Sequence, residues 1–120
     1  MKIRLILDGR TLTATLDDTP TARDFAALLP LRLRLDDYAA TEKIADLPRK
    51  LTTEGAPAGH TPSAGDLAYY APWGNLAIFH RDFRYSERLV RLGRLEGDLA
   101  ALRAPGALNA TLERIEAAGR

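Results

Sequence analysis

The sequence predicts a mainly β protein that forms a single domain over residues 1–120, the usual length for one domain with one core. Six to eight short stretches alternate apolar and polar residues, and two others have the apolar spacing of short helices. Glycine and proline separate many of these stretches, as they do at turns. Many short strands joined in this way favour a closed or nearly closed antiparallel barrel with two short helices.

The first two strands are predicted to form a hairpin. Apolar residues alternate with other residues over 3–7 and again over 11–16, so that each stretch has one face suited to burial. Asp8 and Gly9 lie between them, and glycine adopts the positive φ of a tight hairpin turn at little cost. The inward positions are expected to be Ile3, Leu5, Leu7, Leu12, Ala14 and Leu16.

A helix is predicted within residues 17–30, where the apolar period changes from two to about 3.6. Thr19 can cap its N-terminus, Pro20 suits the first helical position, and Pro30 stops it. The next stretch, 31–38, again alternates, with leucines on one face and arginines on the other, as in a strand with one solvent-exposed face.

The pattern loosens between residues 38 and 66, and the Gly- and Pro-rich part, 53–66, is expected to be an ordered loop or short extended pieces. Two strands should follow around a turn at Pro72-Trp73-Gly74. The final elements are less uniform, because the last of them also has fair helical propensity. In order, the predictions are strands at 67–72, 75–80 and 88–96, a short helix at 97–104, and a strand at 107–116.

The strand pair around Trp73 is expected to have two distinct faces. Leu67 and Tyr69 should point opposite to Ala68 and Tyr70, because successive side chains of a strand alternate. In the second strand, Leu76 and Ile78 should likewise point opposite to Ala77 and Phe79. One face would then belong to the core, and the other would be the floor of a pocket.

Charge and composition narrow the range of partners. The formal net charge of +1 gives no global attraction to nucleic acid or to anionic membranes. No apolar run approaches the roughly 18 residues of a membrane-spanning helix, and Arg4 interrupts the apolar run that a secretory signal would need. Without cysteine, disulfide and thiolate chemistry are excluded. We therefore expect a cytoplasmic protein with no membrane partner.

Three segments, taken in order, resemble cyclophilins. Residues 17–28, DDTPTARDFAAL, are similar to the first cyclophilin helix, and residues 92–102, LGRLEGDLAAL, are similar to its Phe-Gly-Lys-Val-x-Glu-Gly-Met stretch. Residues 65–79 resemble the central strand pair. The matching or conservatively substituted positions in the first two segments are Thr21, Ala22, Phe25, Leu28, Gly93, Arg94, Leu95, Glu96, Gly97 and Leu99.

The stretch GDLAYYAPWGNLAIF also resembles the compact cyclophilin-like proteins of bacteria and archaea. Their recurring motif is kept at Gly65, Asp66, Tyr70, Pro72 and Gly74. The resemblance implies a cyclophilin-like barrel of about eight antiparallel strands, with two helices capping its ends. It implies no particular activity, because the compact family has no settled biochemical role and one fold can host many functions.

The resemblance does not extend to the residues of a prolyl isomerase. Arg49 is the counterpart of the catalytic arginine, and Phe79 matches a phenylalanine of the proline pocket. The glutamine and the second phenylalanine of the cyclophilin pocket have no counterpart. The rim tryptophan and histidine are also missing from their usual segment, since Trp73 precedes it and His80 directly follows Phe79. Robust isomerase activity is therefore not expected.

Other arrangements of reactive residues are less informative. His60 and His80 have no carboxylate at a compact ligand spacing, so no metal site is expected. No glycine loop with the spacing of a phosphate-binding motif is present, so no nucleotide cofactor is expected. Glu42 is either an acid or base at a pocket mouth or, as we favour, part of a solvated charged loop.

The stretch 81–94 contains arginines at intervals of three or four residues, interleaved with two aromatic residues. On a helix they would form a basic stripe for nucleic acid. Nearby acidic residues offset part of this charge, and a strand would direct Arg88 and Arg91 to opposite sides, so nucleic acid is not the expected partner. The arginines are Arg81, Arg84, Arg88, Arg91 and Arg94.

The hypothesis we favour is a non-catalytic module that binds a small molecule or a peptide. Its ligand-binding residues would be Arg49, Tyr70, Trp73, Phe79 and His80, an apolar floor with polar anchors. The first alternative is an enzyme with unidentified catalytic residues, either a weak prolyl isomerase or an acid/base catalyst. The second alternative is a structural protein that forms homo-oligomers through exposed aromatic residues.

Overall fold

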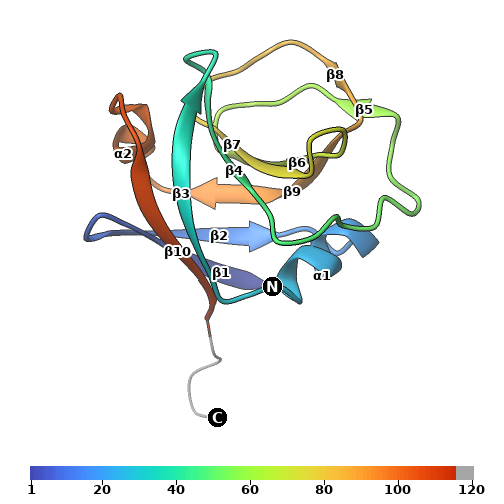
Figure 1. Cartoon of the computed structure of the whole chain (residues 1–120), viewed down its shortest axis with the longest axis horizontal. Coiled ribbons are helices and arrows are strands. Elements are labelled where there is room, and N and C mark those ends of the chain that lie inside the picture. Colours follow the sequence, from blue (N-terminus) through green and yellow to red (C-terminus); the bar gives the residue numbers. More distant parts are fainter. Residues whose placement is uncertain (116–120) are drawn as a thin grey trace.

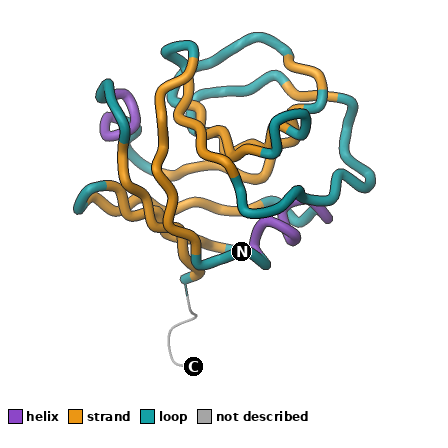
Figure 2. The backbone as a smooth tube through the Cα atoms, viewed as in Figure 1, coloured by secondary structure: helices purple, strands orange, loops and turns teal. Residues whose placement is uncertain are grey.

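The computed structural model describes residues 1–115, which form a barrel of strands with two short helices at its periphery (Figures 1 and 2). The predicted end of the last strand, at residue 116, lies outside the described residues. The elements are β1 (Lys2–Leu7), β2 (Arg10–Leu16), α1 (Pro20–Ala26), β3 (Leu31–Tyr38), β4 (Glu42–Asp46), β5 (Gly59–His60), β6 (Asp66–Tyr70), β7 (Asn75–Phe79), β8 (Ser86–Glu87), β9 (Leu89–Glu96), α2 (Ala100–Arg103) and β10 (Leu108–Arg114).

Eight of these strands close into a barrel in the order β1-β10-β3-β4-β7-β6-β9-β2. All neighbouring pairs are antiparallel, and β5 and β8 form a separate two-stranded piece outside the barrel. The interior is filled mainly by leucine, isoleucine and alanine side chains from the strands, together with Tyr69 and Val90, Phe25 of α1 and Leu102 of α2. The predicted closed, mainly β barrel with two short helices is confirmed.

The hairpin and first helix form where the local sequence predicts them. β1 and β2 pair with Leu5 opposite Leu12, which places the inward residues of both strands on the same face. Thr19 precedes α1, and its Oγ1 accepts a hydrogen bond from the backbone N–H of Ala22 at 3.2 Å. Proline occupies the start of α1, as expected, although the helix ends at Ala26 and not at Pro30.

The barrel contains one strand, β4, that the sequence pattern does not predict. β4 lies in the stretch where the alternation loosens, and it pairs with β3 on one side and β7 on the other. The alternation of apolar and polar residues is not visible in β4, because the charged residue Lys43 occupies an inward position at the end of the barrel. The alternative of a helix near the C-terminus is wrong, since β10 is a strand between β1 and β3.

The two predicted faces of the β6–β7 pair are confirmed. Leu67, Tyr69, Leu76 and Ile78 belong to the barrel core. The alternate side chains form a second apolar group on the outside of the barrel wall, which we call the outer cluster. Its buried members are Ala68, Ala77, Phe79 and Leu89, with Ile44, Tyr70 and Phe83 packed against them.

Gly93 lies where β9 meets β2, and the strands approach too closely there for a side chain. A Cβ on Gly93 would overlap the carbonyl oxygen of Thr15 and lie 2.9 Å from the Cα of Leu16. We predict that Gly93→Ala lowers the free energy of unfolding by about 2 kcal/mol, because the strands must separate. Urea denaturation would measure this, with Thr11→Val at the exposed end of β2 as the control. Equal stability of Gly93→Ala and the unmodified chain would contradict the close approach.

Candidate functional site

A small pocket lies against the outer cluster, on the side of the barrel formed by β3, β4, β7 and β6. Its volume is about 90 Å³, and we call it the aromatic pocket. The turn between β6 and β7 contributes one wall, and the first residue of β9 contributes part of another. The lining residues are Tyr38, Glu42, Ile44, Tyr70, Trp73, Asn75 and Leu89.

The ring of Trp73 stands at nearly right angles to the rings of Tyr38 and Tyr70 beside this pocket. The ring of Trp73 lies 5.4 Å from that of Tyr38 and 5.3 Å from that of Tyr70, measured between centroids. The interplanar angles are 86° and 85°, the edge-to-face geometry that aromatic quadrupoles favour. Trp73 is 54% exposed and Tyr38 is 43% exposed, so these two rings form the rim.

The turn between β6 and β7 holds Trp73 in this position. The N–H of Gly74 donates to the carbonyl oxygen of Tyr70 at 2.9 Å, and that of Trp73 donates to the same oxygen at 3.2 Å. Gly74 has a φ of +67°, which glycine adopts at little cost. The proline and glycine of the sequence motif therefore form a tight turn that carries the tryptophan to the pocket rim.

Two polar side chains from neighbouring strands also line the pocket, and both are buried. Glu42 on β4 is 7% exposed and Asn75 on β7 is 2% exposed. The Oδ1 atom of Asn75 has no hydrogen-bond partner. Burial raises the pKa of Glu42 to about 7, and the Thr41 hydroxyl offsets this only in part. The pocket therefore combines an unused amide acceptor with a carboxyl group that changes charge near neutral pH.

Strand register explains why these side chains meet. Ile44 is opposite Ala77, and Asn75 is opposite Tyr70, so their side chains project from the same outer face. Glu42 lies two residues before Ile44 and shares that face, whereas Lys43 between them points the other way.

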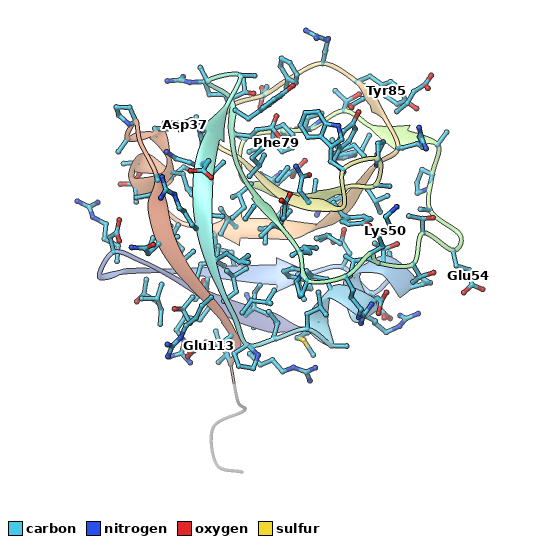
Figure 3. All side chains as sticks on the ribbon, in the orientation of Figure 1. Asp37, Lys50, Glu54, Phe79, Tyr85 and Glu113 are labelled. Atoms are coloured by element: carbon cyan, nitrogen blue, oxygen red, sulfur yellow. The ribbon has the colours of Figure 1, made fainter. Side chains whose placement is uncertain are left out.

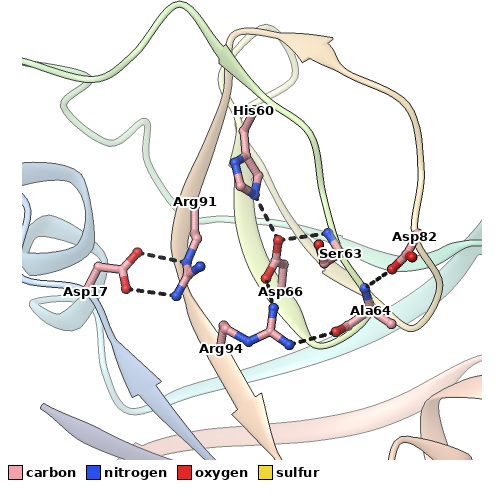
Figure 4. Close-up of polar contacts among 8 residues, drawn as sticks. All are labelled: Asp17, His60, Ser63, Ala64, Asp66, Asp82, Arg91 and Arg94. Carbon is pink, nitrogen blue, oxygen red and sulfur yellow. Dashed lines mark hydrogen bonds and ion pairs between the residues drawn. The ribbon is translucent and has the colours of Figure 1, made fainter.

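A second and larger pocket, of about 190 Å³, adjoins the first, because Leu89 lines both. We call it the polar pocket. It lies between the segment leading into α1, residues 54–60 and the start of β9, and its charged or polar lining includes Asp17, Glu54, His60 and Arg91. Arg91 Nε contacts Asp17 Oδ2 at 3.1 Å across one side of it (Figure 4).

Asp66 organises the wall of the polar pocket. Its buried carboxylate contacts His60 Nε2 at 2.8 Å and Arg94 Nη1 at 2.6 Å, and it accepts a hydrogen bond from the N–H of Ser63 at 2.9 Å (Figure 4). Arg94 also donates to the carbonyl oxygen of Ala64 at 3.1 Å. These contacts attach the loop before β6 to β9, which gives the motif aspartate a structural role.

The structure separates the five residues predicted to bind a ligand. Tyr70 and Trp73 line the aromatic pocket. Phe79 is buried in the outer cluster and is not among the residues that line the pocket; Figure 3 labels its position on the fold. Arg49 lies beside α1, where its Nη2 contacts Asp24 Oδ1 at 2.8 Å. His80 is buried at the end of β7, where the Nε of Arg103 donates to its carbonyl oxygen at 2.9 Å.

The surroundings of Arg49 and His80 affect their chemistry. The Asp24 carboxylate raises the pKa of Arg49, and Asp24 also accepts a hydrogen bond from the N–H of Thr52 at 2.7 Å. These contacts tie the loop after β4 to α1. Burial lowers the pKa of His80, and neighbouring cationic side chains lower it further. His80 is therefore a neutral, buried imidazole at pH 7.

Sequence reasoning missed four residues of the aromatic pocket: Tyr38, Ile44, Asn75 and Leu89. The alternation of side chains along β3 and β7 could have placed Tyr38 and Asn75 on the outer face. It could not have shown that the two side chains line the same pocket. The favoured interpretation of Glu42 as part of a solvated loop is wrong, because this residue is buried in a strand.

The arginines of residues 81–94 make separate contacts. Arg91 pairs with Asp17, Arg94 pairs with Asp66, and the guanidinium of Arg84 lies 4.6 Å from the ring centroid of Phe83.

Among residues 1–115, no group of three or more His, Asp or Glu side chains is arranged to hold a metal ion. In the same part of the chain, none of the helices combines the length and apolar character needed to cross a membrane.

Comparison with known proteins agrees with the architecture. The sequence model described as the cyclophilin-like family matches residues 5–113. The structure is similar to the solution structure of a hypothetical protein from Archaeoglobus fulgidus, with a TM-score of 0.68 and 18% sequence identity. That similarity covers 96% of this chain and 95% of the archaeal chain. No protein with a curated description matches the sequence significantly.

Proposed function

This chain belongs to the cyclophilin-like family, and we propose that it is a non-catalytic module that binds a small molecule or a peptide in the aromatic pocket. The observation that carries the proposal is the pocket itself, in which perpendicular aromatic rings stand beside two buried polar side chains. Ligand sites commonly combine apolar walls with a few convergent polar groups. Tyr70 and Trp73 keep their predicted role as ligand contacts, joined by Tyr38, Glu42 and Asn75.

The surroundings of Arg49 support a role without isomerase chemistry. The arginine of a cyclophilin engages the prolyl amide, but Arg49 is paired with Asp24 and no arginine lines the aromatic pocket within residues 1–115. We therefore predict that the protein does not accelerate cis–trans isomerisation of proline peptides above the uncatalysed rate. A protease-coupled assay would measure this, and acceleration that Arg49→Ala removes would contradict it.

A ligand screen tests the binding function directly. Trp73 is the only tryptophan in the chain and lies at the pocket rim, so its fluorescence reports occupancy. We expect at least one class among metabolites, amines and proline peptides to change this fluorescence and to shift backbone NMR signals around the pocket. Tyr70→Ala should weaken that response, whereas Tyr85→Ala, at an exposed tyrosine beside β8, should leave it unchanged (Figure 3). If no compound perturbs the pocket, the binding function is wrong.

Acid or base catalysis by Glu42 is a second candidate, and one observation favours it. A carboxyl group with a pKa of about 7 can both accept and donate a proton at neutral pH. Turnover of any ligand found in the screen, lost in Glu42→Gln, would replace the non-catalytic proposal with this one.

The remaining alternative is self-association through the exposed rings of Tyr38 and Trp73. Measuring the molecular mass of the protein in solution at high concentration would test it.

A further inference from the structure

We propose that the aromatic pocket binds a protonated alkylamine, with its N–H groups directed at Glu42 and the Oδ1 of Asn75 and its carbon atoms enclosed by the aromatic rings. This inference rests on the proposed binding function and names the chemistry of the ligand. The amine is either a free metabolite or the side chain of a lysine in a peptide. Both present the same group, an ammonium on a short alkyl chain.

Charge is the first reason for a cation. Among the described residues that line the pocket, Glu42 alone can carry a formal charge at neutral pH, and that charge is negative. The adjacent Lys43 does not compensate it, because its Nζ lies on the other face of β4, hydrogen-bonded to the carbonyl oxygens of Ala104 and Gly106. An ammonium ion would neutralise the Glu42 carboxylate, whereas an anion would be repelled by it.

Hydrogen-bonding capacity is the second reason. The Oδ1 of Asn75 is a buried acceptor without a partner, and an ionised Glu42 can only accept. These two acceptors favour a ligand that donates hydrogen bonds. An alkylammonium ion supplies up to three N–H donors, while a carboxylate or phosphate ligand at neutral pH is mainly an acceptor.

The shape and lining of the pocket are the third reason. The ring of Trp73 stands nearly perpendicular to those of Tyr38 and Tyr70, so electron-rich faces of different orientation are available to a cation. Ile44 and Leu89 add apolar surface for alkyl carbons. The volume of about 90 Å³ is about three times the share of one water molecule in the liquid, which suits a small group and not a bulky ring system.

Glu42 also predicts how binding depends on pH. Burial raises its pKa to about 7, so ammonium binding must displace a proton from part of the population at lower pH. The other polar groups around it are the hydroxyl of Thr41 and, in the pocket lining, the phenols of Tyr38 and Tyr70 and the amide of Asn75; none of them is an acidic or basic residue. The affinity for an amine that stays protonated throughout should therefore rise as the pH increases from about 6 to about 8.

The test compares three probes of equal chain length: butylammonium, butan-1-ol and butyrate. Titrations would follow Trp73 fluorescence and backbone NMR shifts at pH 7.5. We expect saturable binding of butylammonium at least about tenfold tighter than that of butan-1-ol, and no binding of butyrate. Tetramethylammonium, which keeps the charge but has no N–H group, should bind more weakly than butylammonium.

Two variants test whether Glu42 is responsible for butylammonium binding and for its pH dependence. Glu42→Gln should weaken butylammonium binding by about tenfold or more at pH 7.5 and should remove the rise in affinity with pH. Asp46→Asn removes a carboxylate from the same strand, outside the pocket, and should bind within about twofold of the unmodified chain. Circular dichroism of both variants confirms that they are folded.

The proposal is overturned if butan-1-ol binds as tightly as butylammonium, or if Glu42→Gln binds butylammonium unchanged. Its failure differs from failure of the binding function, because neutral or anionic compounds in the wider screen could still occupy the pocket. A final comparison identifies the source of the amine. A short lysine-containing peptide that binds more tightly than butylammonium indicates a peptide ligand, whereas tighter binding of butylammonium indicates a free amine.

Discussion

Replacing Lys43 with methionine is expected to lower the free energy of unfolding by about 3 kcal/mol, because two backbone carbonyl oxygens lose their hydrogen-bond donor. Lys43 is fully buried, yet its Nζ is satisfied by three acceptors: the carbonyl oxygen of Ala104 at 2.8 Å, that of Gly106 at 2.5 Å, and Asp37 Oδ1 at 2.6 Å. Methionine keeps the approximate shape but donates no hydrogen bond. The segment after α2 would then lose its two hydrogen bonds to Lys43 on β4 and keep only the bond from Gly106 N–H to Asp37 on β3.

Urea denaturation at pH 7 measures this effect. Lys50→Met is the matched control, because Lys50 is an exposed lysine in the loop after β4, and it should change stability by less than about 0.5 kcal/mol (Figure 3). Hydrogen exchange adds a local readout, since faster exchange of the amide of Gly106, which donates to Asp37 Oδ2 at 2.7 Å, is expected in Lys43→Met. A variant as stable as the unmodified chain would show that these contacts contribute nothing to folding.

The Glu42→Gln substitution is expected to stabilise the protein at high pH. Burial raises the pKa of Glu42 from its usual value of 4.5 to about 7, so the folded state binds the proton more tightly than the unfolded state does. The stability that this protonated group contributes is therefore fully present below pH 4.5 and is lost as the pH rises through 7. The difference between the two pKa values corresponds to about 3 kcal/mol at pH 8, which glutamine avoids because it carries no charge.

The measurement is a series of denaturation curves for both proteins between pH 5 and pH 8. Comparing the variant with the unmodified chain at each pH cancels other titrations in this range. His80 is one of these and acts in the opposite direction, because its lowered pKa means that folding is disfavoured when the pH falls. The stability difference should grow with pH. Parallel curves at every pH would show that Glu42 is not a buried carboxyl group.

Local sequence was sufficient for the elements whose residues interact with near neighbours. The first hairpin follows from alternation around Asp8-Gly9, and α1 follows from Thr19 and Pro20 at its start. The opposite faces of β6 and β7 also follow from alternation alone, because the period of a strand assigns each side chain to one side. β4 was not predictable in this way, because Lys43 occupies an inward position that an apolar residue normally takes.

The aromatic pocket was predictable only in the part that a single segment provides. Tyr70 and Trp73 lie three residues apart on a strand and its turn, and the sequence places them together. Glu42 gave no signal of burial, since a charged residue beside another charged residue is usually solvated. Arg49, selected through the family resemblance, is instead paired with Asp24 of α1 and is not among the residues that line the pocket.

The sequence alone determined the fold class, the main strands and which side of the central strand pair joins the core, because alternation, turn residues and helix caps act over a few residues. Only the tertiary structure decided which side chains share a pocket. Closure of the barrel sets β4 beside β7 and β3 beside β4, and this brings Tyr38, Glu42 and Asn75 to the rings of Tyr70 and Trp73. The same closure buries Glu42 and raises its pKa, since desolvation depends on neighbours that are distant in the chain.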